Sequence, residues 1–281
     1  MRQGVEELRE FYARPLGKAA REMVSRKVTE AWDSLRGLDV LALGYATPFL
    51  GGLGDSARRI VAAMPAAQGV EAWPAGEANR ACLADETSLP FQNALFDRVL
   101  AVHALEESDN PLALMRELWR VLAPSGRAIL VVTARHGLWA DAEGSPFGHG
   151  RPFSRRQLEA LVREAELEPV GWTRALYAPP VAWAARWAEG FESAGALLWP
   201  PFAGLILMET IKQTFAVRPR GVRVRVRRPV QGALQPAPVG RSPLGRLIDR
   251  RRKPIVGAGV GVHTNNSPTL TPARPEPGAP R

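Results

Sequence analysis

The sequence predicts an α/β fold: a doubly wound, mainly parallel sheet of seven strands in a Rossmann-like arrangement. Short apolar runs alternate with segments of helical periodicity from residue 38 to about residue 217, and such alternation is typical of parallel sheets. The first run, 40–43, is continuously apolar, as expected of a central strand covered on both faces. Gly44 follows this run directly and predicts a tight turn. The 281 residues leave room for one such domain and an appendage.

Two helices are expected ahead of the first strand. Apolar residues recur at helical spacing within 3–36, and Pro15 divides this stretch in two. Tyr12 lies on the apolar face of the first helix, where it either packs in the core or closes over a bound ligand. Gly37 ends the second helix, so we expect 1–37 to form a helical cap on a domain that spans 38–217.

The segment after Gly44 is expected to form a helix and then a second strand. Asp55 or Ser56 caps this helix, which runs to about Met64. The second strand is expected at 69–73, because Pro74 stops it.

The remaining elements follow the same alternation. Pro111 begins one helix, and Ser154 with Gln157 three residues later forms a capping box that begins another. An insert at 177–201 is rich in tryptophan and predicted to be helical; Trp183, Trp187 and Trp199 either pack on the sheet, line an apolar pocket or touch a membrane surface. The other strands are expected at 80–84, 96–102, 128–132, 169–174 and 205–215.

The charge of the chain is concentrated at its end. Residues 218–281 contain 14 Arg and Lys against 2 Asp and Glu, a net charge of +12, whereas 1–217 carry a net charge of −3. The tail is rich in proline and has no aromatic residue, which predicts disorder. Its arginines favour either weak contact with nucleic acid or anionic lipid, or simple solvation. The lack of aromatic residues that stack on bases argues against specific nucleic-acid binding.

The remaining composition predicts a soluble cytoplasmic protein. The N-terminus has no apolar run of the kind found in signal peptides, and no stretch is a good candidate for a transmembrane segment. Cys82 is the single cysteine and lies in an expected strand, so we expect a buried thiol with no internal disulfide and no catalytic role. We expect no metal site.

Residues 83–132 carry several motifs in a specific order. An acidic residue precedes Leu-Pro-Phe at 89–91, Phe-Asp begins the strand at 96, Val-His-Ala-Leu-Glu follows it at 102–106, and Arg-Val-Leu-Ala-Pro-Ser-Gly forms a turn at 120–126. This order resembles the class I S-adenosylmethionine (SAM)-dependent methyltransferases, of the type 11 methyltransferase domain family. The resemblance implies that SAM is the cofactor.

The resemblance also assigns the methionine end of SAM to the turn after the first strand. The family has an acid before this turn and a Gly-x-Gly pair within it, whereas this chain has Ala42, Gly44 and Ala46 at these positions. The first motif is therefore degenerate, with one glycine left. Gly44, Tyr45 and Ala46 are the residues implied to contact the cofactor here, and Pro48 removes a backbone N–H from the turn.

The family places a carboxylate at the end of the second strand, where it binds the ribose hydroxyls. Glu71 is the only carboxylate within the expected strand, and Glu77 is a weaker substitute; the alternative for Glu71 is an exposed strand residue. Asp85, with Glu86 beside it, matches the position that reads the adenine amino group. His103 lies at the carboxyl end of a strand, where open α/β sheets bind ligands. It is either a cofactor contact and candidate base or a packed histidine.

The predicted function is methyl transfer from SAM to a small or lipophilic molecule. The degenerate first motif motivates an alternative, a non-catalytic protein of the same fold that acts as a binding or scaffolding module. A dinucleotide-dependent oxidoreductase is a weaker alternative, because the Gly-x-Gly-x-x-Gly turn is absent.

Overall fold

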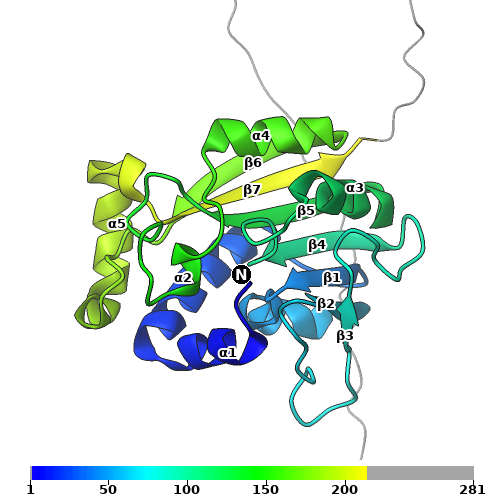
Figure 1. Cartoon of the computed structure of the whole chain (residues 1–281), viewed down its shortest axis with the longest axis horizontal. Coiled ribbons are helices and arrows are strands. Elements are labelled where there is room, and N and C mark those ends of the chain that lie inside the picture. The colour runs from blue at the N-terminus through cyan, green and yellow to red at the C-terminus, as the bar shows by residue number, and fades with distance from the viewer. Residues whose placement is uncertain (1, 214–281) are drawn as a thin grey trace, which may run out of the picture. The chain divides into compact units, whose positions relative to one another are not determined.

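The computed structural model describes residues 2–213, and they form a seven-stranded sheet between two layers of helices (Figure 1). The strand order is β3-β2-β1-β4-β5-β7-β6. The first five of these strands are parallel, and β7 runs antiparallel to both β5 and β6. The strands are β1 (Asp39–Gly44), β2 (Arg59–Pro65), β3 (Ala81–Ala84), β4 (Phe96–Val102), β5 (Leu122–Thr133), β6 (Leu167–Ala175) and β7 (Leu205–Lys212).

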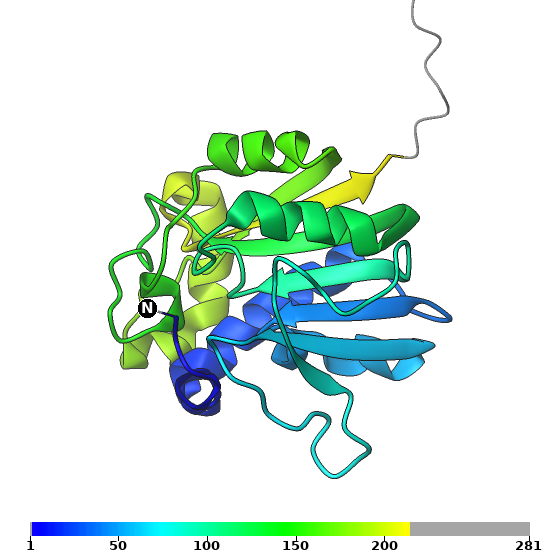
Figure 2. The ribbon, with the colours of Figure 1, turned by 45° about the vertical axis from the view of Figure 1, so that its right-hand side comes forward.

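Helices cover both faces of this sheet. Helices α1 (Val5–Ala13) and α2 (Pro15–Ala31) pack on one face, and α3 (Pro111–Val121) and α4 (Arg155–Glu164) pack on the other (Figure 2). Alternate residues of β1 enter the two cores, as the two-residue period of a strand requires: Val40 and Ala42 face α2, and Leu41 and Leu43 face α3. The predicted doubly wound sheet with N-terminal helices is confirmed.

The prediction of a helix that ends at about Met64 is wrong. Two short 3-10 turns, η1 (Thr47–Phe49) and η2 (Gly51–Ser56), replace it, and the following residues form β2. Pro48 and the three glycines within 51–54 disfavour a regular helix here. Pairing with β1 then decides the strand, with Val40 opposite Ile60.

The prediction of a strand at 69–73 is also wrong. These residues form a loop, because β2 already occupies the position beside β1. The loop is held against the start of α1, where the Val5 N–H donates to the Gln68 carbonyl at 2.8 Å.

The other predicted strands overlap β3 to β7, but β5 begins at Leu122, within the turn predicted at 120–126, and β7 ends at Lys212. Asn110 caps α3, and Ser154 and Gln157 form the predicted capping box of α4. The insert contains η4 (Ala182–Trp187), α5 (Ala188–Leu198) and η5 (Pro200–Phe202). Cys82 lies on β3 and is half-buried, and burial raises its pKa. The predicted domain limits stay predictions, and the tail at 218–281 lies outside the described residues.

Among the residues that the structure describes, none belongs to a helix that is both long and apolar enough to cross a bilayer.

Candidate functional site

The turn after β1 lies against the end of β4. Gly44 has a φ of +77°, and a Cβ added to it would lie 2.2 Å from the Val102 carbonyl oxygen. The next residue, Tyr45, donates its N–H to that same oxygen at 2.9 Å. This close contact between strand ends therefore requires glycine at position 44.

An aromatic cluster covers these strand ends. It consists of Phe11, Tyr12, Tyr45, Phe49 and Phe147 around His103, and each of the six is at most 5% exposed. The Tyr12 ring stacks on Tyr45, with centroids 5.8 Å apart, and meets Phe49 edge-on at 5.3 Å. The His103 and Phe147 rings are 4.8 Å apart. Residues from α1, the β1 turn, η1, the β4 end and the loop after β5 thus pack together as one apolar cluster.

A buried hydrogen bond links His103 to the N-terminal helix. The Tyr12 hydroxyl lies 2.6 Å from His103 Nε2. Burial lowers the pKa of His103 to about 3, so the imidazole is neutral near pH 7. Burial also raises the pKa of Tyr12 well above its ordinary value. Tyr12 is therefore the donor and His103 Nε2 the acceptor.

Glu106 is a second buried titratable group at this edge, and the sequence prediction missed it. Its Oε1 accepts the Thr133 N–H at 3.0 Å, and its Oε2 is buried without a partner. Burial raises the pKa of Glu106 to about 7. Its position in the Val-His-Ala-Leu-Glu motif was the available signal, but burial of the carboxylate depends on the loop after β5.

Residues 2 and 3, here called the N-terminal strap, cross the same edge. The Arg2 guanidinium pairs with Glu86, after β3, and donates to the Ala104 carbonyl, after β4, at 2.9 Å. The Gln3 N–H donates to Glu107 Oε2 at 2.7 Å. The strap therefore joins the loops that follow β3 and β4.

Buried polar atoms without a partner gather around this edge. Eleven such side-chain atoms occur among the described residues, and seven belong to the strap or to segments that follow β2, β4 and β5. Native structures leave few buried polar atoms unpaired, so a concentration of them indicates a missing partner. The seven are Arg2 Nε, Gln3 Oε1, both amide atoms of Gln68, Glu106 Oε2, Ser108 Oγ and Ser145 Oγ.

The predicted site residues are only partly brought together. Gly44, Tyr45, Ala46 and His103 are buried at one edge. Glu71 lies in a loop rather than on the second strand, so the strand position inferred for it is wrong; its carboxylate accepts a hydrogen bond from Tyr45.

The two acids after β3 differ in their surroundings. Asp85 is exposed, and its Oδ1 accepts the Thr87 N–H and hydroxyl at 2.8 and 2.7 Å, which lowers its pKa. Glu86 is held by Arg2. The cofactor roles of Glu71, Asp85 and Glu86 stay predictions.

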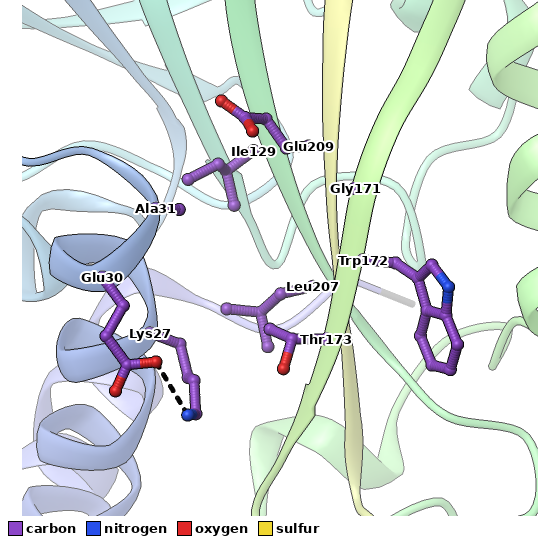
Figure 3. Close-up of a pocket in the computed structure, with 9 residues that line it drawn as sticks. All are labelled: Lys27, Glu30, Ala31, Ile129, Gly171, Trp172, Thr173, Leu207 and Glu209. Atoms are coloured by element: carbon purple, nitrogen blue, oxygen red, sulfur yellow. Dashed lines mark hydrogen bonds and ion pairs between the residues drawn. The ribbon is translucent and has the colours of Figure 1, made fainter. Parts of the chain in front are cut away.

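Two cavities lie away from this edge. One of about 230 Å³ separates α2 from the sheet (Figure 3), between Lys27 and Glu30 on the helix and Leu207 on β7. A groove of about 1070 Å³ lies over β2 and β3, where the 3-10 turns replace a longer helix. Glu77, the weaker candidate for the ribose carboxylate, lines the groove, and the other predicted cofactor residues line neither cavity. The described part of the chain holds no cluster of three or more His, Cys, Asp or Glu side chains suited to a metal ion.

Comparison with known proteins identifies the domain. Residues 43–130 match the family model described as a methyltransferase domain. Residues 43–130 therefore form a methyltransferase domain. This match bears out the predicted enzyme class, a methyltransferase, and the predicted SAM cofactor.

Solved methyltransferase structures share the fold. A SAM-dependent methyltransferase from Thermotoga maritima is 17% identical, with 74% of this chain and 96% of that chain covered and a TM-score of 0.51. A methyltransferase bound to the Trm112 activator in Haloferax volcanii is 17% identical, with coverages of 68% and 89% and a TM-score of 0.51. A SAM-dependent methyltransferase from Archaeoglobus fulgidus is 15% identical, with coverages of 68% and 94% and a TM-score of 0.50. No curated protein matches the sequence.

The donor groups at the edge of this methyltransferase suit SAM, whose amino acid, ribose and adenine all form hydrogen bonds. Gln68 offers both a donor and an acceptor in the loop after β2, and Gly44 permits close backbone approach. The aromatic cluster and the strap are closed over the same strand ends.

Proposed function

We propose that this methyltransferase transfers the methyl group of SAM to a small or lipophilic molecule that binds beside His103. The observation that carries this proposal is the pairing of two environments at one edge of the sheet. Unpaired buried polar atoms suit the cofactor, and the aromatic cluster suits an apolar acceptor. Entry of either ligand requires Tyr12 and the N-terminal strap to move, because both cover the strand ends.

SAM supplies a methyl group that is already activated by its sulfonium, so the protein mainly aligns the acceptor and excludes water. The aromatic cluster provides the dry surroundings. Gln68 and the backbone at Gly44 are proposed to hold the cofactor.

Two buried groups are candidates for removing a proton from the acceptor. His103 in the closed structure is a weak base, since its pKa is about 3 and Tyr12 occupies Nε2. Glu106 has a pKa of about 7, close to the value that suits a general base at neutral pH. We therefore assign proton transfer to Glu106, with His103 positioning Tyr12.

Calorimetric titration with SAM and S-adenosylhomocysteine tests the proposal, with NADH as the negative control. Gln68→Leu removes both unpaired amide atoms, so we expect about tenfold weaker SAM binding together with a stability gain of about 1 kcal/mol. Thr210→Val is the matched control, since its buried hydroxyl on β7 is also unpaired but lies on another element. We expect this control to gain stability and keep its SAM affinity.

A non-catalytic role is the second candidate, and the closed aromatic cluster favours it. If SAM does not bind at millimolar concentration while the protein is folded, the non-catalytic role replaces the proposed one. Equal SAM affinity in Gln68→Leu and wild type would instead remove Gln68 from the site.

A further inference from the structure

The insert after β6 presents its large apolar side chains to solvent. Trp183 and Trp187 are 60% and 64% exposed, and Leu197 is 81% exposed. Leu198, Trp199 and Phe202 are exposed as well. We call these six residues the tryptophan patch. Figure 1 shows α5 at the side of the molecule, next to α2. An exposed apolar surface of this kind indicates an interaction site.

The inner face of the insert is made of small residues instead. Ala184, Ala188 and Gly195 are buried, and a Cβ on Gly195 would lie 2.4 Å from Tyr177 Cβ. The Glu192 carboxylate accepts the Tyr177 N–H at 3.1 Å. A globular helix ordinarily buries its large apolar residues, so the amphipathic pattern here is inverted. The contacts of Gly195 and Glu192 hold this face of α5 against Tyr177.

The patch also contains an open apolar groove. It measures about 420 Å³ and lies between Trp183, Trp187, Phe191 and Trp199. The Trp183 and Phe191 rings meet edge-on, with centroids 6.1 Å apart. Tryptophan combines a large apolar ring with a polar N–H, a combination that favours the boundary between lipid and water.

Charge distinguishes a lipid surface from other apolar partners. Residues 218–281 carry a net charge of +12, whereas 1–217 carry −3. Peripheral proteins bind membranes stably when two weak signals act together, for example an apolar anchor and a polybasic segment. A second copy of the chain carries the same net charge of +9 and would be repelled overall, whereas an anionic bilayer would attract it.

We propose that the tryptophan patch docks this protein on an anionic lipid bilayer, to which the net charge of +9 of the full chain adds an electrostatic attraction. The patch enters the interface, and no part of the chain needs to span the membrane. This proposal does not depend on methyl transfer, although a lipophilic acceptor would be reached from such a surface.

Co-sedimentation of the full chain with vesicles tests the proposal. The vesicles contain either phosphatidylglycerol mixed with phosphatidylcholine or phosphatidylcholine alone. We expect binding to the anionic vesicles that weakens at high salt, and at least a tenfold loss of binding in the double variant Trp183→Ser, Trp187→Ser. Trp172→Ser is the matched control, since Trp172 is exposed on β6 outside the patch. It should change binding less than twofold.

Several outcomes would overturn the proposal. The first is a wild-type protein that does not bind anionic vesicles. The second is a double variant that binds them as tightly as wild type does. The third is a wild-type protein that is a dimer in solution while the double variant is a monomer. Tryptophan quenching by brominated lipids in the wild-type protein keeps the test valid if the double variant does not fold. Absence of quenching in vesicle-bound protein would then exclude the patch from the interface.

Discussion

Burial moves the pKa values of His103 and Glu106 in opposite directions. The pKa of His103 falls from 6.5 to about 3, and the pKa of Glu106 rises from 4.5 to about 7. Below pH 6.5 the unfolded histidine takes up a proton that the folded one does not, so stability falls as the pH falls. Above pH 4.5 the unfolded glutamate ionises before the folded one, so stability falls as the pH rises toward 7. Each effect is about 1.4 kcal/mol per pH unit, and the two cancel between pH 4.5 and 6.5.

Replacing Glu106 removes its contribution to the pH dependence of stability and leaves that of His103. In Glu106→Gln the free energy of unfolding should fall by about 2–3 kcal/mol between pH 6.5 and 4.5 relative to the wild-type profile. Urea unfolding at pH 4.5, 5.5, 6.5 and 8 measures it. Glu164→Gln is the control, because Glu164 is exposed at the end of α4. Identical pH profiles for Glu106→Gln and wild type would show that Glu106 is not buried as an acid.

Substitutions at Gly44 and Gly37 distinguish the effect of steric contact on stability from the effect of backbone conformation. Both have positive φ, +77° and +74°, but only Gly44 faces a neighbouring carbonyl within 4 Å. Gly37→Ala should cost about 1–2 kcal/mol of stability from its backbone alone. Gly44→Ala should cost about 2–5 kcal/mol, because the methyl group also displaces the end of β4. Chemical unfolding measures both, and equal losses would contradict the close contact between β1 and β4.

At the scale of elements, the position of the second strand was the main error of sequence prediction. Residues 59–65 combine helix-forming alanines with a strand-forming Ile60-Val61 pair, so their local preference is ambiguous. Pairing with β1 decides between the alternatives. The inferred position of Glu71 was wrong as a consequence, while Gln68 lies in the loop that follows the observed strand.

Helix α5 offers a test of its inverted packing. Gly195→Ala places a methyl group against the Tyr177 ring and should destabilise the protein by about 1–3 kcal/mol. Gly190→Ala lies in the same helix with nothing within 4 Å, so it should stabilise the protein by about 0.5–1 kcal/mol. Thermal unfolding of the two variants gives the comparison. A neutral Gly195→Ala would mean that α5 does not pack on Tyr177.

At the scale of the whole molecule, stability and charge belong to different parts of the chain. Both hydrophobic cores are built from residues between Leu8 and Met208, whereas the excess positive charge lies in 218–281. Deleting 218–281 should therefore shift the melting temperature by less than about 2 °C. It should also reverse the net charge from +9 to −3 and abolish retention on a cation exchanger. A fall of more than about 5 °C would show that the deleted segment packs on the folded part.

The sequence alone determined the fold class, the methyltransferase domain and the approximate position of most strands. These depend on local signals: apolar runs of strand length, the Ser154–Gln157 capping box and the ordered motifs of 83–132. Only the tertiary structure decided which segment pairs with β1, that Tyr12 donates to His103 and that Glu106 is buried. The physical reason is sequence separation. Tyr12 and His103 are 91 residues apart, and burial of Glu106 depends on the loop after β5, so no local pattern encodes either contact.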